Sequence, residues 1–442
     1  MVTRTALGMG MLGLFASVVG CGGDDGNRVD AGPTADAPPH AFAGVTIPLQ
    51  SFGGIEYTAP LTVGGQLFST QVDTGSTVTA VASTTCTACG VTPEYTPGSG
   101  ATDKLKTDDA QYADQSGWHG EVFEDRAGLS ADTMVTLDFV SITSQSNKFF
   151  TDNSYQGILG LGPAALLDPG TSAYPDVLAA GGTTEIMAFQ MCPDRGQLFL
   201  GGYDKATALT APVLTPMVPN DPFYEVEIAS LGLGSDSLGS AASAFGNTTV
   251  DTGTSISFVP TTIATALLAK VNAAPGFQAL FPGQMFANTN TGGCVNLGTV
   301  TPTQIDAMLP PLTISFPTTD GSAPKVLSLA PTRSYIWIDT VDGGTPDACI
   351  SITDSGGSAQ DGSLIGDTLM QSFVTVFDVP AKQMGFAPEA GCAEATTTAA
   401  PVPPGAVAAA PRRSDGPWWM TSPHAHVPPR FAQMYLQAHA PK

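Results

Sequence analysis

The sequence predicts an all-β protein made of two similar lobes, with few short helices. Its Val, Ile, Thr, Phe and Leu residues occur in short runs that end at Gly, Pro, Asp or Ser, which is typical of β-strands joined by turns. A chain of 442 residues is too long for one simple core and suits two lobes with flanking segments. The clearest helix is expected at residues 261–272, just before Pro275 and Gly276.

A short motif occurs twice along the chain. Residues 72–77 read VDTGST, and residues 250–255 read VDTGTS. Each copy is followed later by two apolar residues and a glycine, at 158–160 and 364–366. An internal repeat of this kind indicates duplication and a pseudo-twofold relation between two β lobes.

The repeat and the local composition divide the chain into five segments. We predict a lipoprotein signal peptide at residues 1–20, a flexible tether at 21–44, an N-terminal β lobe at 45–214, a C-terminal β lobe at 215–392, and a disordered Ala/Pro-rich tail at 393–442.

The N-terminus has the pattern of an export signal. Arg4 precedes an apolar run at residues 6–19, which is too short for a comfortable membrane span. Residues 18–21 read VVGC and resemble a bacterial lipobox, in which the Cys is lipidated; an ordinary signal peptide with a chance Cys is the alternative. We expect lipidation at Cys21, export, and anchoring to the cell envelope. The outer membrane is favoured over the inner one, and the protein would be periplasmic or surface-exposed.

The charge balance excludes one class of partner. Net charge is −23 with only 16 Lys and Arg residues, whereas nucleic-acid binding requires a basic surface. An acidic surface fits an exported protein, and it also fits a protein that works at low pH. We expect a monomer with no cofactor, which contacts the membrane only through its lipid anchor.

Six cysteines are left once Cys21 is set aside, and an even number in an exported chain favours disulfides. Cys86 and Cys89 form a CxxC that can close a local loop; half a zinc site or a redox pair is the alternative, but no second CxxC or nearby His cluster supports zinc. The other pairs that we propose, although sequence does not fix connectivity, are Cys294–Cys349 and Cys192–Cys392.

The two aspartates of the repeated motif, Asp73 and Asp251, sit between apolar neighbours, where a carboxylate is costly unless it is compensated. Each context reads as strand, tight turn, strand, with hydroxyl residues around the Asp. A single copy would be read as an ordinary turn Asp with satisfied hydrogen bonds. Two copies in the same setting indicate a shared chemical role.

With these motifs, residues 45–392 resemble a pepsin-like aspartic protease. The resemblance is carried further by QGILGLGP at 156–163, by LIGDTLMQSFVTVFDVPAKQMGFAP at 364–388, by the flap-like segment at 111–130 and by FYEVEIASLGLG at 223–234. It implies a bilobal pepsin-like fold with a cleft between the lobes. It also implies an aspartic endopeptidase that acts on polypeptides, with peptide hydrolysis by a water held between two aspartates at acidic pH.

The resemblance also assigns roles to individual residues. Asp73 and Asp251 would form the catalytic pair and share a proton. The supporting residues of the two loops would be Thr74 and Thr252, which join the loops, Ser76 and Thr254, which bond the outer carboxylate oxygens, and Gly75 and Gly253, which let backbone N–H groups approach. No metal site is implied.

The flap departs from the family pattern. Tyr112 matches the family's flap tyrosine, but an ordinary strand aromatic is the alternative. The family often has a Trp after the first motif that bonds this Tyr, whereas this chain has Ala80. We therefore expect the Tyr to be held differently, by Trp118 or His119, or more loosely. The tether is short and acidic where relatives carry a basic pro-segment, so we expect no zymogen step.

Other catalytic classes lack the residues that they need. A Ser/His/Asp triad needs a His in the body of the protein, where only His40 and His119 precede the tail. No HExxH motif or cluster of His and carboxylates is present for metal-dependent hydrolysis. The serious alternative is a non-catalytic pepsin-fold binding or inhibitor protein. Two intact DTG motifs favour catalysis over that alternative.

Overall fold

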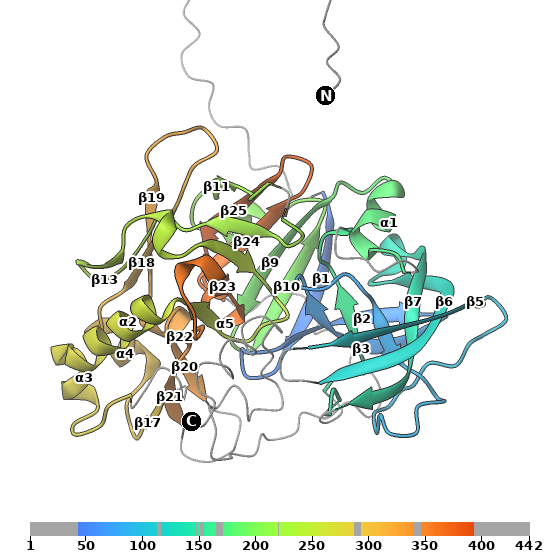
Figure 1. Ribbon diagram of the computed structural model, residues 1–442, viewed down its shortest axis with the longest axis horizontal. Coiled ribbons are helices and arrows are strands. Elements are labelled where there is room, and N and C mark those ends of the chain that lie inside the picture. Colours follow the sequence, from blue (N-terminus) through green and yellow to red (C-terminus); the bar gives the residue numbers. More distant parts are fainter. Residues whose placement is uncertain are drawn as a thin grey trace, which may run out of the picture. The chain divides into compact units, whose positions relative to one another are not determined.

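The computed structural model (Figure 1) describes residues 43–112, 116–146, 148–150, 154–164, 171–219, 221–286, 293–339 and 346–392. The predicted signal peptide, Cys21, the tether up to residue 42 and the tail lie outside these residues. Across these ranges, no helix is long and apolar enough to cross a membrane.

Strands dominate the described chain, as predicted. The largest sheet has the order β11-β25-β24-β9-β10-β1-β2-β3-β8-β4-β7-β6-β5. Its strands are β1 (Val45–Ser51), β2 (Tyr57–Val63), β3 (Gln66–Asp73), β4 (Ala80–Ala82), β5 (Thr102–Gln111), β6 (Gly117–Gly128), β7 (Val135–Ser146), β8 (Gly157–Gly160), β9 (Ile186–Cys192), β10 (Arg195–Leu200), β11 (Val213–Pro216), β24 (Phe373–Asp378) and β25 (Gln383–Pro388).

The second half of the chain adds three smaller sheets. The first contains β12 (Glu225–Glu227), β15 (Asn247–Val250), β23 (Ser363–Ile365), β16 (Ser257–Val259) and β22 (Ile352–Asp354). The second contains β14 (Asp236–Gly239), β13 (Ser230–Leu233), β18 (Leu312–Phe316) and β19 (Lys325–Leu329), and the third contains β17 (Cys294–Asn296), β21 (Asp347–Ile350) and β20 (Ile336–Asp339).

The α-helices within the described ranges are short: α1 (Tyr174–Ala180), α2 (Thr261–Ala273), α3 (Pro275–Leu280), α4 (Pro302–Met308) and α5 (Asp367–Met370). Helix α2 confirms the helix predicted at residues 261–272, and it buries Ile263, Leu267 and Val271 along one face. The sequence reading missed α3, which begins at Pro275 itself. Proline suits the first helical position because its fixed φ is already helical and its missing N–H has no partner there.

The last strands of the chain return to the sheet of the first half. Strand β24 pairs antiparallel with β9, with Val374 opposite Gln190, and β25 pairs with β11. Strand β11 therefore spans the lobe boundary that we predicted between residues 214 and 215. In Figure 1 the orange strands β24 and β25 lie beside the green strands β9 and β10. One continuous sheet thus connects the two sequence halves that carry the DTG motifs.

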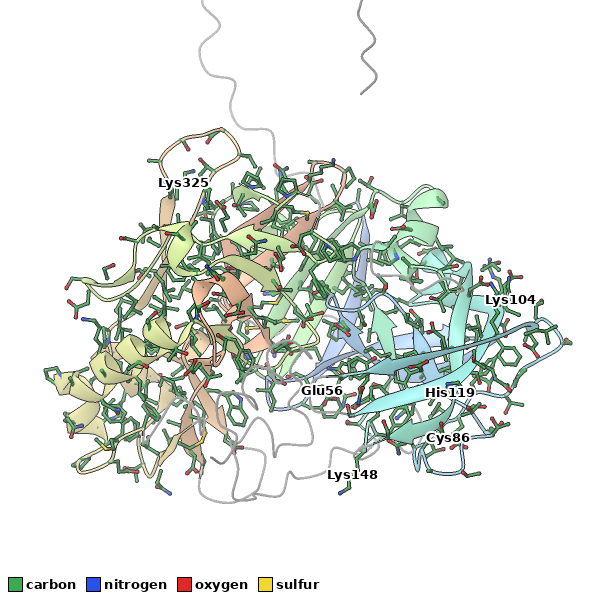
Figure 2. All side chains as sticks on the ribbon, viewed as in Figure 1. Glu56, Cys86, Lys104, His119, Lys148 and Lys325 are labelled. Carbon is green, nitrogen blue, oxygen red and sulfur yellow. A yellow bond between two sulfur atoms is a disulfide. The ribbon has the colours of Figure 1, made fainter. Side chains whose placement is uncertain are left out.

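Apolar side chains fill the interior, whereas charged side chains other than a few carboxylates stay at the margin. Figure 2 shows Lys148 and Lys325 at the periphery of the ribbon. Glu56 is fully buried, as are the large rings of Tyr57 and Tyr95. A buried carboxylate is costly unless it is protonated or bonded, so Glu56 is an unusual residue of this core.

Three disulfides link the six remaining cysteines. Cys86 bonds Cys89, Cys192 bonds Cys392 and Cys294 bonds Cys349, which are the pairs proposed from the sequence. The Cys192–Cys392 bond ties the end of β9 to the end of the described chain, across 200 residues. The Cys86–Cys89 bond joins cysteines that are only 3 positions apart in the sequence.

Removing the long-range disulfide should destabilise the protein more than removing the short one. Because the entropy cost of loop closure grows with loop length, a Cys192→Ala/Cys392→Ala double variant should lose about 5 kcal/mol of unfolding free energy. A Cys86→Ala/Cys89→Ala variant is the matched control and should lose about 2 kcal/mol. Urea unfolding without reductant measures both values, and equal losses would show that loop length does not govern the effect.

Candidate active site

Asp73 and Asp251 occupy equivalent places in the two halves of the chain. Asp73 is the last residue of β3, and Asp251 follows directly after β15. Each strand pairs in parallel with a strand from the matching apolar-apolar-Gly segment, with Asp73 opposite Gly160 and Val250 opposite Ile365. The repeated sequence pattern is therefore a repeated backbone arrangement that places a carboxylate at the end of each strand.

Each carboxylate receives the same two hydrogen bonds from its own loop. The backbone N–H of Gly75 donates to Asp73 Oδ1 at 2.8 Å, and Ser76 Oγ donates to Asp73 Oδ2 at 2.5 Å. At the second loop, the N–H of Gly253 donates to Asp251 Oδ1 at 2.8 Å, and Thr254 Oγ1 donates to Oδ2 at 2.6 Å. Both side chains are therefore held in one orientation.

The two loops are joined by reciprocal bonds between Thr74 and Thr252. The backbone N–H of each residue donates to the Oγ1 of the other at 3.0 Å. Each hydroxyl then donates across to the carbonyl of the residue before the opposite Asp, Val250 or Val72, also at 3.0 Å. Since all these groups are buried, they fix the position of one aspartate relative to the other.

The glycines of the motif show how close the two loops come. A Cβ on Gly75 would lie 2.7 Å from both carboxylate oxygens of Asp251, and a Cβ on Gly253 would overlap Asp73 Oδ1. Only glycine fits at either position, because each backbone lies against the carboxylate of the opposite loop. The two carboxyls therefore lie next to each other, close enough for the charge of Asp73 to act on Asp251.

Burial controls the charge of this pair. Asp73 is 6% exposed and Asp251 is 2% exposed. Burial, and next the negative charge of Asp73, raises the pKa of Asp251 to about 8. Two adjacent buried carboxyls cannot both ionise at low cost, so the pair holds one proton at acidic and neutral pH.

Two further buried carboxyls lie close to the pair, and the sequence reading missed both. Asp367 begins helix α5, and burial raises its pKa well above the usual range, with smaller contributions from the charges of Asp251, Glu56 and Asp73. Its backbone N–H donates to the carbonyl of Thr254 at 2.8 Å. Asp367 could have been singled out from the sequence because it follows directly after Leu364-Ile365-Gly366. The sequence around Glu56 contains no comparable motif.

The predicted flap is the hairpin of β5 and β6, with Gln111 opposite Gly117. Tyr112 stands at its turn and is half-buried, and its ring stacks on Phe149 with centroids 5.4 Å apart. The tip at residues 113–115, which includes Ala113 and Gln115, lies outside the described residues. Phe149 was not singled out from the sequence because nothing in its local pattern distinguishes it from a core aromatic.

Trp118 bonds Tyr112, the predicted flap residue, in this chain with Ala80 where the family often has a Trp. Trp118 Nε1 donates to the Tyr112 hydroxyl at 3.0 Å. Ala80 and Trp118 belong to the same buried cluster. The cluster therefore combines a small side chain at position 80 with the large indole of Trp118 from β6. His119 is exposed and points to the other face of the strand, as alternation requires.

Comparison with known proteins identifies the family. The model of the eukaryotic aspartyl protease family matches residues 56–389. This chain belongs to that family. An aspartic protease of Phaffia rhodozyma is 28% identical over 339 residues, which are 75% of this chain and 76% of the relative. A vacuolar aspartic protease of Candida albicans is 24% identical over 77% of each chain, and a cathepsin D of Dictyostelium discoideum is 25% identical over 78% of this chain and 86% of the relative.

Membership of the aspartyl protease family confirms the predicted fold class, the bilobal pepsin-like fold, and the predicted activity, an aspartic-type endopeptidase that acts on polypeptides. The match ends at residue 389, close to the last described strand. Among the described residues, Cys192, Glu389 and Cys392 are close enough to be considered as metal ligands, but the two cysteines are bonded to each other.

Proposed function

We propose that Asp73 and Asp251 are the catalytic groups of this protease and that neither lobe forms the site alone. The observation that carries the proposal is the contact between two buried carboxyls that are oriented by equivalent bonds and joined by Thr74 and Thr252. A structural Asp in a turn has no need of a second carboxyl beside it. Their proximity raises the free-energy cost of ionising both carboxyls, and a proton-transfer role makes use of this cost.

The chemistry follows from one proton on two carboxyls. The ionised carboxylate accepts a proton from a bound water, whose oxygen attacks the scissile carbonyl carbon. The protonated carboxyl donates a hydrogen bond to the carbonyl oxygen and stabilises the negative charge that develops there. The tetrahedral intermediate then collapses, the C–N bond breaks, and the amine leaves with a proton supplied by the pair. The reaction needs no covalent intermediate and no metal.

The supporting residues keep the two carboxyls available for this exchange. Ser76 and Thr254 donate to the outer oxygens, and the N–H groups of Gly75 and Gly253 donate to the inner ones. These donors orient the lone pairs and reduce the motion of each carboxyl between proton transfers. Thr74 and Thr252 set the distance between the two loops.

Endopeptidase action is tested by mapping cut sites. The mature protein is incubated at acidic pH with a reduced and alkylated polypeptide, and the products are identified by mass spectrometry. We expect internal cuts, with apolar side chains beside the cleaved bond. Ladders of single-residue losses from either end would contradict the proposal.

The flap tyrosine is proposed to cover the bound substrate, and Trp118 to position it. Replacing Trp118 by Phe removes the indole N–H and keeps a large ring in the buried cluster. We expect kcat/KM to fall by about tenfold, because one hydrogen bond that positions Tyr112 is worth about 1 kcal/mol or slightly more. The loss should appear mainly in KM, with little change in the unfolding free energy.

His119→Gln is the matched control for Trp118→Phe, because it changes the next residue on the exposed face of the same strand. It should leave kcat/KM unchanged. Equal losses in both variants would indicate a general disturbance of the hairpin. No loss in Trp118→Phe would mean that Tyr112 is an ordinary strand aromatic.

For location, we propose that the protein is exported as a monomer and anchored by a lipid on Cys21, with the outer membrane favoured. The signal-like N-terminus and the three disulfides support an oxidising compartment outside the cytoplasm. A Cys21→Ala variant should leave the membrane fraction and stay active in the soluble one. A variant that stayed with the membrane would contradict the lipid anchor.

A further inference from the structure

Strand β12 is the end strand of the sheet that leads to Asp251. The strand order of this sheet is β12-β15-β23-β16-β22, so β15 is the neighbouring strand of β12. Strand β12 has only three residues, and its Glu225 lies opposite Thr249 of β15. The N–H of Val250 donates to the carbonyl of Tyr224, the residue before β12, at 3.0 Å. Since Asp251 follows Val250, a movement of β12 would remove a support of the second catalytic loop.

Two carboxyls lie beside each other at this strand, and we call Glu225 and Asp221 the β12 carboxyl pair. Glu225 is only 1% exposed, and Thr249 Oγ1 donates to its Oε1 at 3.0 Å. Asp221 is half-buried and close enough for its charge to act on Glu225. The N–H of Phe223 donates to Asp221 Oδ1 at 3.1 Å, which fixes the turn between the two. Neither carboxyl belongs to the proposed catalytic pair.

The β12 carboxyl pair holds a proton in acid because the charged form of Glu225 is unfavourable. Burial, and next the charge of Asp221, raises the pKa of Glu225 to about 7. The hydrogen bond from Thr249 favours the ionised form but is outweighed. Above about pH 7 both members of the pair are therefore charged, and two carboxylates repel each other strongly where water is largely excluded.

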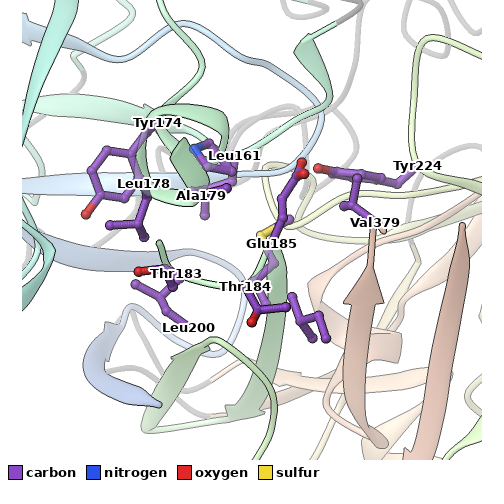
Figure 3. Close-up of a pocket in the computed structure, with 13 residues that line it drawn as sticks. Leu161, Tyr174, Leu178, Ala179, Thr183, Thr184, Glu185, Leu200, Tyr224 and Val379 are labelled. Carbon is purple, nitrogen blue, oxygen red and sulfur yellow. The ribbon is translucent and has the colours of Figure 1, made fainter. Parts of the chain in front are cut away.

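The other charged groups around β12 act on other residues or face water. Strands β15 and β11 pack against β12 and contain no titratable residue. Glu227, at the end of β12, is exposed. The charges of Glu185 and Asp176 act on Tyr224, and Figure 3 shows the Tyr224 hydroxyl directed toward the Glu185 carboxyl. The repulsion that follows loss of the proton therefore arises within the β12 carboxyl pair itself.

We propose that the β12 carboxyl pair is a pH-dependent switch and that Glu225 is a positioning residue for Asp251. With one proton on the pair, β12 stays on β15 and Asp251 keeps its place beside Asp73. When that proton leaves, repulsion moves β12 away from β15, and the second catalytic loop loses its support. A misplacement of about 1 Å at a catalytic group can cost about a hundredfold in rate. This inference rests on the proposed catalytic role of Asp251.

Glu225→Gln tests the switch, because the amide imitates the protonated carboxyl: its oxygen accepts from Thr249 and its NH₂ group can donate to Asp221. At pH 5 its kcat/KM should equal that of the wild type. At pH 8, about one wild-type molecule in ten still carries the Glu225 proton, so the variant should be about tenfold more active. Cleavage stays measurable there, because the pKa of Asp251 is about 8.

Two further variants define the pair. Glu227→Gln is the matched control, because it removes a charge two residues further along the same strand at an exposed position, and it should keep the wild-type pH profile. Asp221→Asn removes the second charge of the pair and should also raise kcat/KM at pH 8. Identical pH profiles in Glu225→Gln and the wild type would overturn the switch. No gain in Asp221→Asn would overturn the part assigned to Asp221.

Hydrogen exchange of the Val250 amide tests the strand movement without using activity. Glu225 becomes an ordinary carboxyl once β12 has left, so protection in the wild type, corrected for the intrinsic rate, should fall by up to about tenfold per pH unit between about pH 5 and pH 7. The fall should be much smaller in Glu225→Gln, and equal falls would overturn the proposal. A protein that shows this difference but cleaves no polypeptide would contradict the proposed catalytic roles and leave the strand movement established.

Discussion

The Asp251→Asn variant should lose peptidase activity by at least about 10⁴-fold in kcat, the scale seen when an essential proton-transfer group is removed. An amide can neither take the water proton nor supply a proton to the leaving amine. Its shape matches the carboxyl, so the N–H of Gly253 still has an oxygen to bond. The loss should therefore appear in kcat, with KM changed little. Activity is measured on an internally quenched peptide at acidic pH.

The fold of Asp251→Asn should stay intact, because the loops are held by Thr74 and Thr252 and not by the carboxyl itself. Circular dichroism and a cooperative urea transition check this. Asp236→Asn is a matched control, since Asp236 is an exposed aspartate paired with Lys270, and it should keep full activity. An active Asp251→Asn enzyme would sink the catalytic assignment.

The second large effect is a loss of stability as pH rises. Burial and nearby charges raise the pKa of Asp251 to about 8 and of Glu225 to about 7, and they raise that of Asp367 well above the usual range. Each group is an ordinary carboxyl when the chain is unfolded. Between about pH 4 and pH 8 the folded protein thus binds more protons than the unfolded chain, so the unfolding free energy falls as pH rises.

Asp251 alone should account for on the order of 5 kcal/mol of this loss, since one pKa unit corresponds to about 1.4 kcal/mol. Its contribution is fully present below the unfolded pKa, near 4, and is lost as pH rises through about 8. Urea unfolding at pH 4 and pH 8 measures the difference. The protein should be markedly more stable at pH 4.

The Asp251→Asn variant also serves as the control for this pH effect. Asn does not ionise, so the variant should be more stable than the wild type at pH 8 and should show a smaller fall from pH 4 to pH 8. The exposed Glu121→Gln variant should reproduce the wild-type curve. A protein that loses stability below about pH 5 would contradict both the sign of the effect and the expectation of acidic function.

Local pattern was enough to predict much of the fold. The apolar face of residues 261–272 predicted α2, and the repeated DTG context predicted the strand ends at β3 and β15. The continuity of the large sheet was not predictable, because the pairing of β24 with β9 joins strands almost 200 residues apart and leaves no local signal. The position of β11 across the predicted boundary has the same cause.

The candidate site was predictable only where a motif carried it. The two aspartates and their loops are encoded in contiguous residues. Tyr112 is held by a hydrogen bond from Trp118 and by stacking on Phe149. These residues are separate in the sequence and come together only in the folded chain. Glu56 and Asp367 become notable only through burial beside the pair, and burial of a single carboxyl is not visible in sequence.

The most direct test of the central claim is a pepstatin-sensitive cleavage assay. The purified protein is incubated with a denatured polypeptide at intervals from pH 2 to pH 7, with and without pepstatin, an inhibitor of pepsin-like proteases. We expect cleavage that is strongest on the acidic side of this range and is abolished by pepstatin. No cleavage at any pH would contradict catalysis by Asp73 and Asp251 and would favour a non-catalytic binding protein with this fold.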